Sequence, residues 1–175
     1  MSTATMTTSP PGPDPRYRPW RMRIFTATWL SYFGFYFCRK PFYAVKGQLG
    51  EVQGWDAATL SYLGTAYLLA YAIGQFVAGF SGDKLGPRRL LLIGMGATML
   101  ATACFGITNS LGWFTVLMFI QGLAQATGWS GNVGAIAPWF HRNERGTVLG
   151  WWGTCYQTGG VLGTMLAAYL LGVWG

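Results

Sequence analysis

Long runs of uncharged, mainly hydrophobic residues alternate with short charged segments along this chain. Four runs without Lys, Arg, Asp or Glu cover residues 24–38, 57–82, 90–140 and 146–175. A helix that rises ~1.5 Å per residue needs about 20 apolar residues to cross a hydrocarbon core of ~30 Å. The pattern therefore predicts an all-α integral membrane protein whose helices are joined by short loops.

The lengths of these runs predict five membrane helices. The first run is too short to cross a bilayer, so its helix must continue through Arg39 and Lys40. The third run is too long for one helix, and the turn-forming residues of segment 109–112 divide it. The predicted spans are 24–46, 58–81, 89–109, 112–137 and 146–171. The Pro-rich residues 1–19 are predicted to form a flexible cytoplasmic tail.

Composition also indicates a membrane protein, and the placement of the charges argues against nucleic acid as a partner. Only 10% of the residues are charged, 51% are hydrophobic and 26 are Gly, whereas soluble domains average roughly 25% charged residues. The net charge of +7 does not indicate nucleic acid, because the cations lie between hydrophobic runs and not on one soluble face. The lipid bilayer is the expected surrounding of this protein.

The distribution of Lys and Arg predicts how the chain is oriented. Most of these residues lie in the tail and in the loops after the second and fourth spans, and the opposite side has Lys46. The positive-inside rule then places the N-terminus in the cytoplasm and residue 175 on the outer side. A plasma (inner) membrane location is expected.

The first span carries an arginine deep in the bilayer. Such a residue costs ~2.5–3.5 kcal/mol on insertion scales and normally faces a cavity or a partner. At helical spacing Arg39 shares a face with three tyrosines, Tyr32, Tyr36 and Tyr43. A planar, bidentate cation among hydroxyl donors suits a phosphate or carboxylate. The alternative is an early helix end at Pro41, with both cations reaching the outer headgroups.

Three other spans carry similar polar and aromatic stripes. These are Tyr67, Tyr71 and Gln75 in the second span, Gln121, Gln125, Trp129 and Asn132 in the fourth, and Trp152 and Tyr156 in the fifth. Any one of these residues could simply join two helices by a hydrogen bond. Stripes on four helices together favour a shared aqueous cavity. In the fifth span, Gly159 and Gly163 form a G-x-x-x-G spacing that permits close approach of another helix.

The loop after the second span has the spacing G-x-x-x-D-[RK]-x-G-x-[RK]-[RK], formed by Gly79, Asp83, Gly86, Arg88 and Arg89. This pattern resembles the cytoplasmic signature of the major facilitator superfamily. Four further segments resemble the organophosphate:phosphate antiporters of that superfamily. They are residues 36–42 (YFCRKPF), 70–74 (AYAIG), 125–129 (QATGW) and 139–146, which holds Trp139, Phe140 and Arg145.

The resemblance implies a transporter of twelve helices in two halves, which exchanges a phosphate ester such as a sugar phosphate or glycerol-3-phosphate for inorganic phosphate by alternating access. Residues 20–175 would form part of the first half, five helices of a six-helix bundle, and the C-terminal half would be missing. Arg39 matches the family's phosphate-binding position. The implied substrate-binding set is Arg39, Lys40, Tyr32, Tyr36, Tyr71, Gln75, Gln125, Trp129 and Tyr156. The implied cytoplasmic gating set is Gly79, Asp83, Gly86, Arg88, Arg89 and Arg145.

Two departures from the family leave the substrate open. Some members have Lys where this chain has Gln75, and the glycerol-3-phosphate type has His where this chain has Tyr156. Because these two positions carry no cation in this chain, we expect weaker binding of a doubly charged phosphate group.

Other classes of protein remain as alternatives. A transporter-like membrane sensor of phosphate esters and a transporter of a carboxylate both fit the residues. An enzyme is not expected, since the only histidine, His141, lies in a predicted loop. No cofactor and no metal site are expected.

Overall fold

The computed structural model describes residues 15–174, which are almost entirely helical. Residues 1–14, most of the predicted tail, lie outside the described range. Within that range the elements are the short 3-10 helices η1 (Pro15–Tyr17) and η2 (Ala137–Trp139) and the α-helices α1 (Arg18–Gln53), α2 (Ala57–Leu85), α3 (Pro87–Phe105), α4 (Leu111–Ile136), α5 (Arg142–Trp152) and α6 (Thr154–Trp174).

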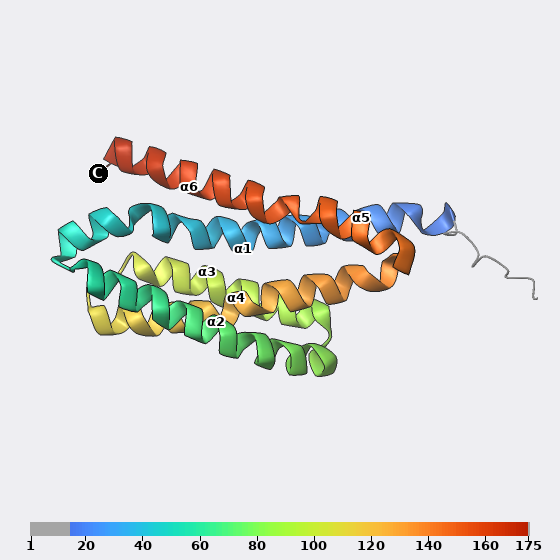
Figure 1. Ribbon diagram of the computed structural model, residues 1–175, viewed down its shortest axis with the longest axis horizontal. Helices are drawn as coiled ribbons and strands as arrows, with labels where there is room; N and C mark the ends of the chain where they lie inside the picture. Colours follow the sequence, from blue (N-terminus) through green and yellow to red (C-terminus); the bar gives the residue numbers. More distant parts are fainter. Residues whose placement is uncertain (1–14, 175) are drawn as a thin grey trace, which may run out of the picture.

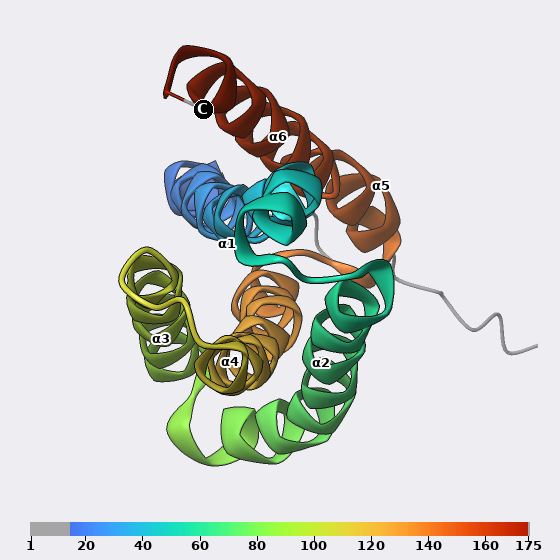
Figure 2. The ribbon, with the colours of Figure 1, turned by 90° about the vertical axis from the view of Figure 1, so that its left-hand side faces the viewer.

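The long helices run roughly parallel or antiparallel in two groups (Figures 1 and 2). Helix α6 lies along α1, and α4 lies between α2 and α3. Helix α4 also contacts α1, so it connects the two groups. Two buried clusters lie at these contacts. One centres on Tyr32, Phe35 and Trp152, and the other on Tyr67 and Met118.

The first helix is longer than the predicted span at both ends. It begins at Arg18 and includes Pro41 in its interior. Arg39 and Lys40 therefore lie within a continuous helix, and the alternative of a helix end at Pro41 is wrong. Residues 15–19, placed in the flexible tail by the sequence, are helical. The first helical turns accept Pro19 because their N–H groups lack intrahelical acceptors in any case.

The fifth predicted span corresponds to two helices in the structure. Helices α5 and α6 follow each other with only Gly153 between them (Figure 1). The N–H of Gly153 still donates the ordinary i to i−4 helical bond to the carbonyl of Leu149, so the break is confined to this one residue. Glycine lowers helix stability, which accounts for an interruption that the hydrophobic pattern does not reveal.

Glycines set the spacing between α4 and its neighbours. A Cβ atom on Gly122 would collide with the backbone carbonyl of Tyr67 on α2. A Cβ on Gly74 of α2 would lie 2.7 Å from that of Ala126 on α4. Such short approaches are typical of membrane helices, where small residues let backbones pack closely.

The α1–α6 contact uses the G-x-x-x-G spacing in the way that the sequence predicts. A Cβ on Gly159 would lie 2.5 Å from the carbonyl oxygen of Phe33, and one on Gly163 would lie 3.0 Å from that of Phe37. The carbonyl of Phe37 has no intrahelical N–H partner at position i+4, because that residue is Pro41. Gly163 thus packs against a carbonyl group that lacks its usual hydrogen bond within α1.

Two tight turns place α2 and α3. Gly54 and Gly86 have φ values of 68° and 76°, which side chains with a Cβ rarely adopt. Asp56 caps α2 by accepting a hydrogen bond of 2.8 Å from the N–H of Thr59. Hydrogen bonds from the Thr59 hydroxyl and from its N–H lower the pKa of Asp56, so the cap stays charged.

Large apolar side chains cover the outside of the bundle. Phe76 and Phe80 on α2 are each 77% exposed, and Leu100 on α3 is 69% exposed. Among the described helices, α2 and α3 have both the length and the hydropathy to cross a bilayer. The count of five spans stays a prediction.

Replacement of Gly159 by Ala tests the α1–α6 contact. The added methyl group must push α6 away from the Phe33 carbonyl, and overpacking of this kind costs about 1–3 kcal/mol. We expect a lower thermal unfolding temperature in detergent. Gly172→Ala, on the same helix with no atom near its would-be Cβ, is the matched control and should not lower it. Equal unfolding temperatures for both variants would show that the contact does not constrain the fold.

Candidate functional site

The guanidinium group of Arg39 lies among three tyrosine rings. Its Cζ atom is 4.9 Å from the ring centroid of Tyr67 on α2. The centroids of Tyr36 on α1 and Tyr71 on α2 are each 5.5 Å away. All three distances are within the range of cation–π attraction. The stripes predicted on the first and second spans therefore meet at this arginine.

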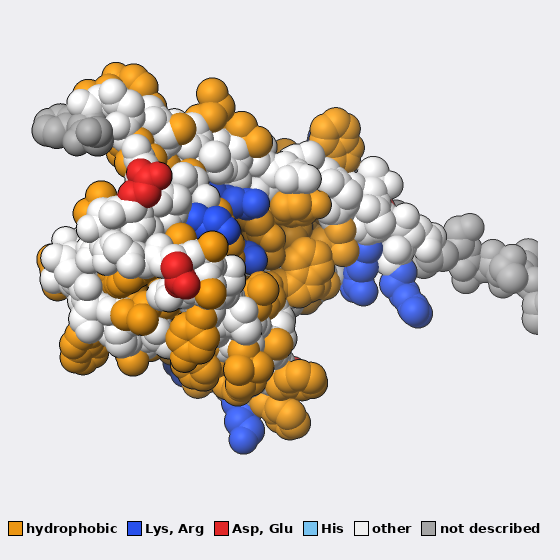
Figure 3. All heavy atoms as spheres, turned by 60° about the vertical axis from the view of Figure 1, so that its left-hand side comes forward, with side chains coloured by type: hydrophobic (Ala, Val, Ile, Leu, Met, Phe, Trp, Pro, Cys, Tyr) orange, Lys and Arg blue, Asp and Glu red, His pale blue; other side chains and the backbone are white. Residues whose placement is uncertain are grey.

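No carboxylate neutralises this cation within the described part of the chain. The ion pair that the structure records there joins Arg21 to Glu144, at another place in the fold. The Tyr43 hydroxyl is also hydrogen-bonded to this cation, so its neighbours are neutral and its positive charge stays available to an added anion. Figure 3 shows Lys and Arg side chains gathered in a hollow on one face, with hydrophobic side chains around them.

A wall of aromatic rings extends from this arginine toward α5 and α6. Tyr32 contacts Tyr36 at 5.3 Å, Trp129 at 6.0 Å and Trp152 at 5.0 Å between ring centroids. Tyr36 also contacts Tyr156 at 5.5 Å. The ring contacts connect α1, α4, α5 and α6. The structure thus brings together four of the residues predicted to bind substrate, in addition to Arg39 and Tyr71.

A cavity of about 390 Å³ opens beside this wall. Trp129, Trp152 and Tyr156 line it together with Gln157 and part of α5. Trp129 is 48% exposed, so its ring offers a free surface. The indole N–H of Trp152 donates a hydrogen bond of 3.2 Å to the hydroxyl of Thr28 on α1, which fixes the wall in place.

The two predicted glutamines join helices. Gln125 is 3% exposed, and its amide nitrogen donates a hydrogen bond of 2.9 Å to the backbone oxygen of Phe35. Gln75 accepts a hydrogen bond of 3.4 Å from the hydroxyl of Ser130 on α4. Of the two, Gln75 is the more exposed and is closer in sequence to Tyr71. Gln125 is thus occupied by α1, whereas Gln75 remains accessible to a ligand.

Lys40 contacts α6, whereas Arg39 contacts the tyrosine rings of α1 and α2. Successive residues of a helix point about 100° apart, and the Lys40 side chain packs against Gly160 of α6. It lines a cavity of about 290 Å³ with Gln157 and Thr164, and Gln157 also lines the cavity beside the aromatic wall. The two adjacent cations of the sequence therefore contact different helices.

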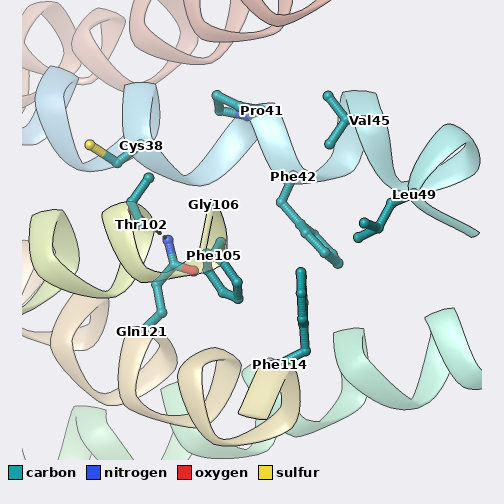
Figure 4. Close-up of a pocket in the computed structure, with 10 residues that line it drawn as sticks. All are labelled: Cys38, Pro41, Phe42, Val45, Leu49, Thr102, Phe105, Gly106, Phe114 and Gln121. Atoms are coloured by element: carbon teal, nitrogen blue, oxygen red, sulfur yellow. Dashed lines mark hydrogen bonds between the residues drawn. The ribbon is translucent and has the colours of Figure 1, made fainter. Parts of the chain in front are cut away.

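A third cavity, of about 270 Å³, contains none of the residues predicted for substrate binding. It lies between α1, α3 and α4, and aromatic and aliphatic side chains such as Phe42, Phe105 and Phe114 dominate its lining (Figure 4). Gln121 reaches its wall and donates to the Thr102 hydroxyl at 3.4 Å. An apolar lining without a cation does not suit an anion.

The predicted gating residues lie in and beside two loops. Gly86 forms the tight turn between α2 and α3, and Asp83, Arg88 and Arg89 are exposed there together with Gly79. Arg145 is at the start of α5, where its Nε donates a hydrogen bond of 3.0 Å to the carbonyl of Phe140. These residues form two groups in the described structure.

One contact near this second group has no counterpart among the features predicted from the sequence. Arg21 of α1 forms an ion pair with Glu144 of α5, and its guanidinium carbon lies 4.4 Å from the ring centroid of Phe140. The sequence offers no signal for a pair 123 positions apart. Tyr67 and Trp152 were predicted on polar stripes but not as members of the binding set, and both belong to the site.

Comparison with known proteins shows the family to which this chain belongs. Residues 24–175 match the Major Facilitator Superfamily. The chain belongs to this superfamily, and it is an all-α integral membrane protein, as the sequence predicts. No solved structure matches the chain significantly.

Three individual relatives show which kinds of protein within the superfamily this chain is similar to. A probable hexose phosphate transport protein of Chlamydia trachomatis is 34% identical over 84% of this chain and 32% of its own length. A putative glycerol-3-phosphate transporter of Arabidopsis thaliana is 34% identical over 89% of this chain and 34% of its own length. The membrane sensor protein UhpC of Escherichia coli is 34% identical over 85% and 34%. The chain thus spans about a third of the length of these relatives.

Replacement of Gln125 by Leu tests whether this residue joins helices or binds ligand. Loss of its bond to the Phe35 carbonyl should lower the free energy of unfolding by about 0.5–1.5 kcal/mol. We expect the affinity for phosphate to change less than twofold. Gln48→Leu, at an exposed position of α1, is the control. A stable Gln125→Leu protein with greatly weakened phosphate binding would contradict this assignment.

Proposed function

We propose that this chain forms one wall of the substrate pathway in a secondary transporter. The transporter exchanges a phosphorylated small metabolite, such as a sugar phosphate or glycerol-3-phosphate, for inorganic phosphate by alternating access. The observation that carries the proposal is the guanidinium of Arg39, held in a helix interior by three tyrosine rings and paired with no described carboxylate. The names of the relatives support the same class of substrate.

Arg39 is proposed to bind the phosphate group. Its fork can donate two parallel hydrogen bonds to two phosphate oxygens, which an ammonium group cannot do. Tyr36, Tyr71 and Gln75 would supply neutral hydrogen-bond partners around it. The exposed ring of Trp129 and the neighbouring Tyr156 would contact the organic part of the ester, since both line the cavity beside the aromatic wall.

The remaining predicted residues take supporting roles in this proposal. Tyr32 holds the aromatic wall together, and Gln125 joins α4 to α1. Lys40 would serve the α6 side of the first helix. The gating role of Gly79, Asp83, Gly86, Arg88, Arg89 and Arg145 would be exercised from the cytoplasmic side, where the positive-inside rule places these residues.

Partners and location follow from the same proposal. The other wall of the pathway would come from a C-terminal half, because the relatives are about two and a half times as long as this chain. The N-terminus would be cytoplasmic, and residue 175 would lie on the outer side of a plasma (inner) membrane. A carboxylate is the second possible substrate class, since an arginine fork fits either anion.

A membrane sensor of phosphate esters is the second candidate function, and the similarity to UhpC favours it. A measurement of phosphate flux across a membrane distinguishes a transporter from a sensor. Proteoliposomes that contain the full-length protein and internal phosphate should take up labelled phosphate if the protein is a transporter. Binding of labelled phosphate without uptake would assign the protein to the sensor class.

Replacement of Arg39 by Lys tests the central residue. The charge is kept but the planar fork is lost, so we expect phosphate exchange in proteoliposomes to fall at least about a hundredfold. Arg142→Lys, an exposed position at the start of α5, makes the same chemical change and should leave exchange unaltered. Exchange at the unmodified rate in Arg39→Lys would refute the assignment.

A further inference from the structure

The hydroxyl group of Tyr67 is buried and has no hydrogen-bond partner in the described structure. The residue is 2% exposed and packs with Leu63, Phe114 and Met118 in one of the two buried clusters. A buried hydroxyl without a partner is unfavourable, and more so at membrane depth, where water cannot replace the missing bond. This group therefore requires an explanation that packing does not provide.

The surroundings of Tyr67 point to Arg39. Its ring is the closest of the three to the guanidinium carbon, at 4.9 Å. The backbone of Tyr67 is held close to α4, because Gly122 packs directly on its carbonyl. Tyr71 stacks beside it with 6.2 Å between ring centroids. The residue is thus held rigidly under the one cation of the candidate site.

Phenylalanine would fill the same space without the unpaired group. Its ring would pack in the cluster equally well and attract the Arg39 guanidinium in the same way. The hydroxyl adds nothing to this conformation of the empty protein. It becomes favourable only when an acceptor arrives near Arg39.

We infer that the Tyr67 hydroxyl is a further substrate-binding group, which donates a hydrogen bond to an oxygen of the phosphate that Arg39 holds. The inference rests on the proposed function, since it adds a donor to the same anion. Arg39 supplies charge and two donors from α1, and Tyr67 supplies a third donor from α2. An anion bound in this way bridges the two helices. Neutral donors also offset the absence of a cation at Gln75, one turn beyond Tyr71 on the same helix.

The test compares Tyr67→Phe with the unmodified full-length protein in detergent, with inorganic phosphate as the probe. Removal of one charge-assisted hydrogen bond should raise the Kd for phosphate about tenfold. Thermal unfolding of Tyr67→Phe without phosphate should occur at the same or a higher temperature, since no bond is lost in the empty state. Tyr62→Phe makes the same change at a 58% exposed position of α2 and should alter neither quantity.

The possible results separate this inference from the proposed function. An unchanged Kd in Tyr67→Phe, with binding abolished in Arg39→Lys, overturns the role of Tyr67 alone. A clear loss of stability in phosphate-free Tyr67→Phe also overturns it, because the hydroxyl would then have a structural partner. An unmodified protein that binds no phosphate overturns both proposals.

Discussion

The close approach of α4 to its neighbours is the constraint on which the rest of the structure depends. Gly122 lets the α2 backbone pass at Tyr67, and Gly128 lets the rings of Tyr32 and Phe35 lie against α4. Each contact fixes a residue beside the candidate site. In a bilayer the hydrophobic effect does not drive helices together, so packing at this distance and interhelical hydrogen bonds carry the association.

The candidate site follows from these contacts. Tyr67 is held against α4, and Arg39 of α1 lies over its ring. Tyr32 joins Trp129 of α4 to Trp152 at the end of α5. The arginine is thereby presented with its charge intact, among rings that neither neutralise nor hydrate it. A cation prepared in this way is suited to an anion that must later be released, because neutral partners add specificity without a second full charge.

The sequence could predict which residues share a helix face but not which neighbour that face meets. Helical spacing placed Tyr36 with Arg39 and Tyr67 with Tyr71, and the structure brings these pairs together. The same spacing could not show that Lys40 packs on Gly160 or that Gln125 donates to Phe35, because both contacts depend on the order of helices around the bundle. The ion pair of Arg21 with Glu144 also depends on the order of helices around the bundle.

The hydrophobic pattern of the sequence also could not predict where a helix continues and where it breaks. The first helix passes through Pro41, and Gly163 of α6 packs against the Phe37 carbonyl, which the proline deprives of its N–H partner. The last predicted span divides at Gly153, which no charge or turn motif announces. In both cases a tertiary contact or a single glycine decides between continuation and interruption, and hydropathy is the same for either outcome.

In the proposed function, the Arg39 guanidinium holds a phosphate group directly. Solid-state NMR of the full-length protein, with 15N-labelled arginine and bound inorganic phosphate in lipid, measures the dipolar coupling between 31P and guanidinium 15N. We expect a coupling that corresponds to direct hydrogen bonds of ~2.7–2.9 Å between nitrogen and oxygen, and its loss in Arg39→Lys. Bound phosphate that shows no coupling to arginine, or a coupling that persists in Arg39→Lys, would show that Arg39 does not hold the phosphate.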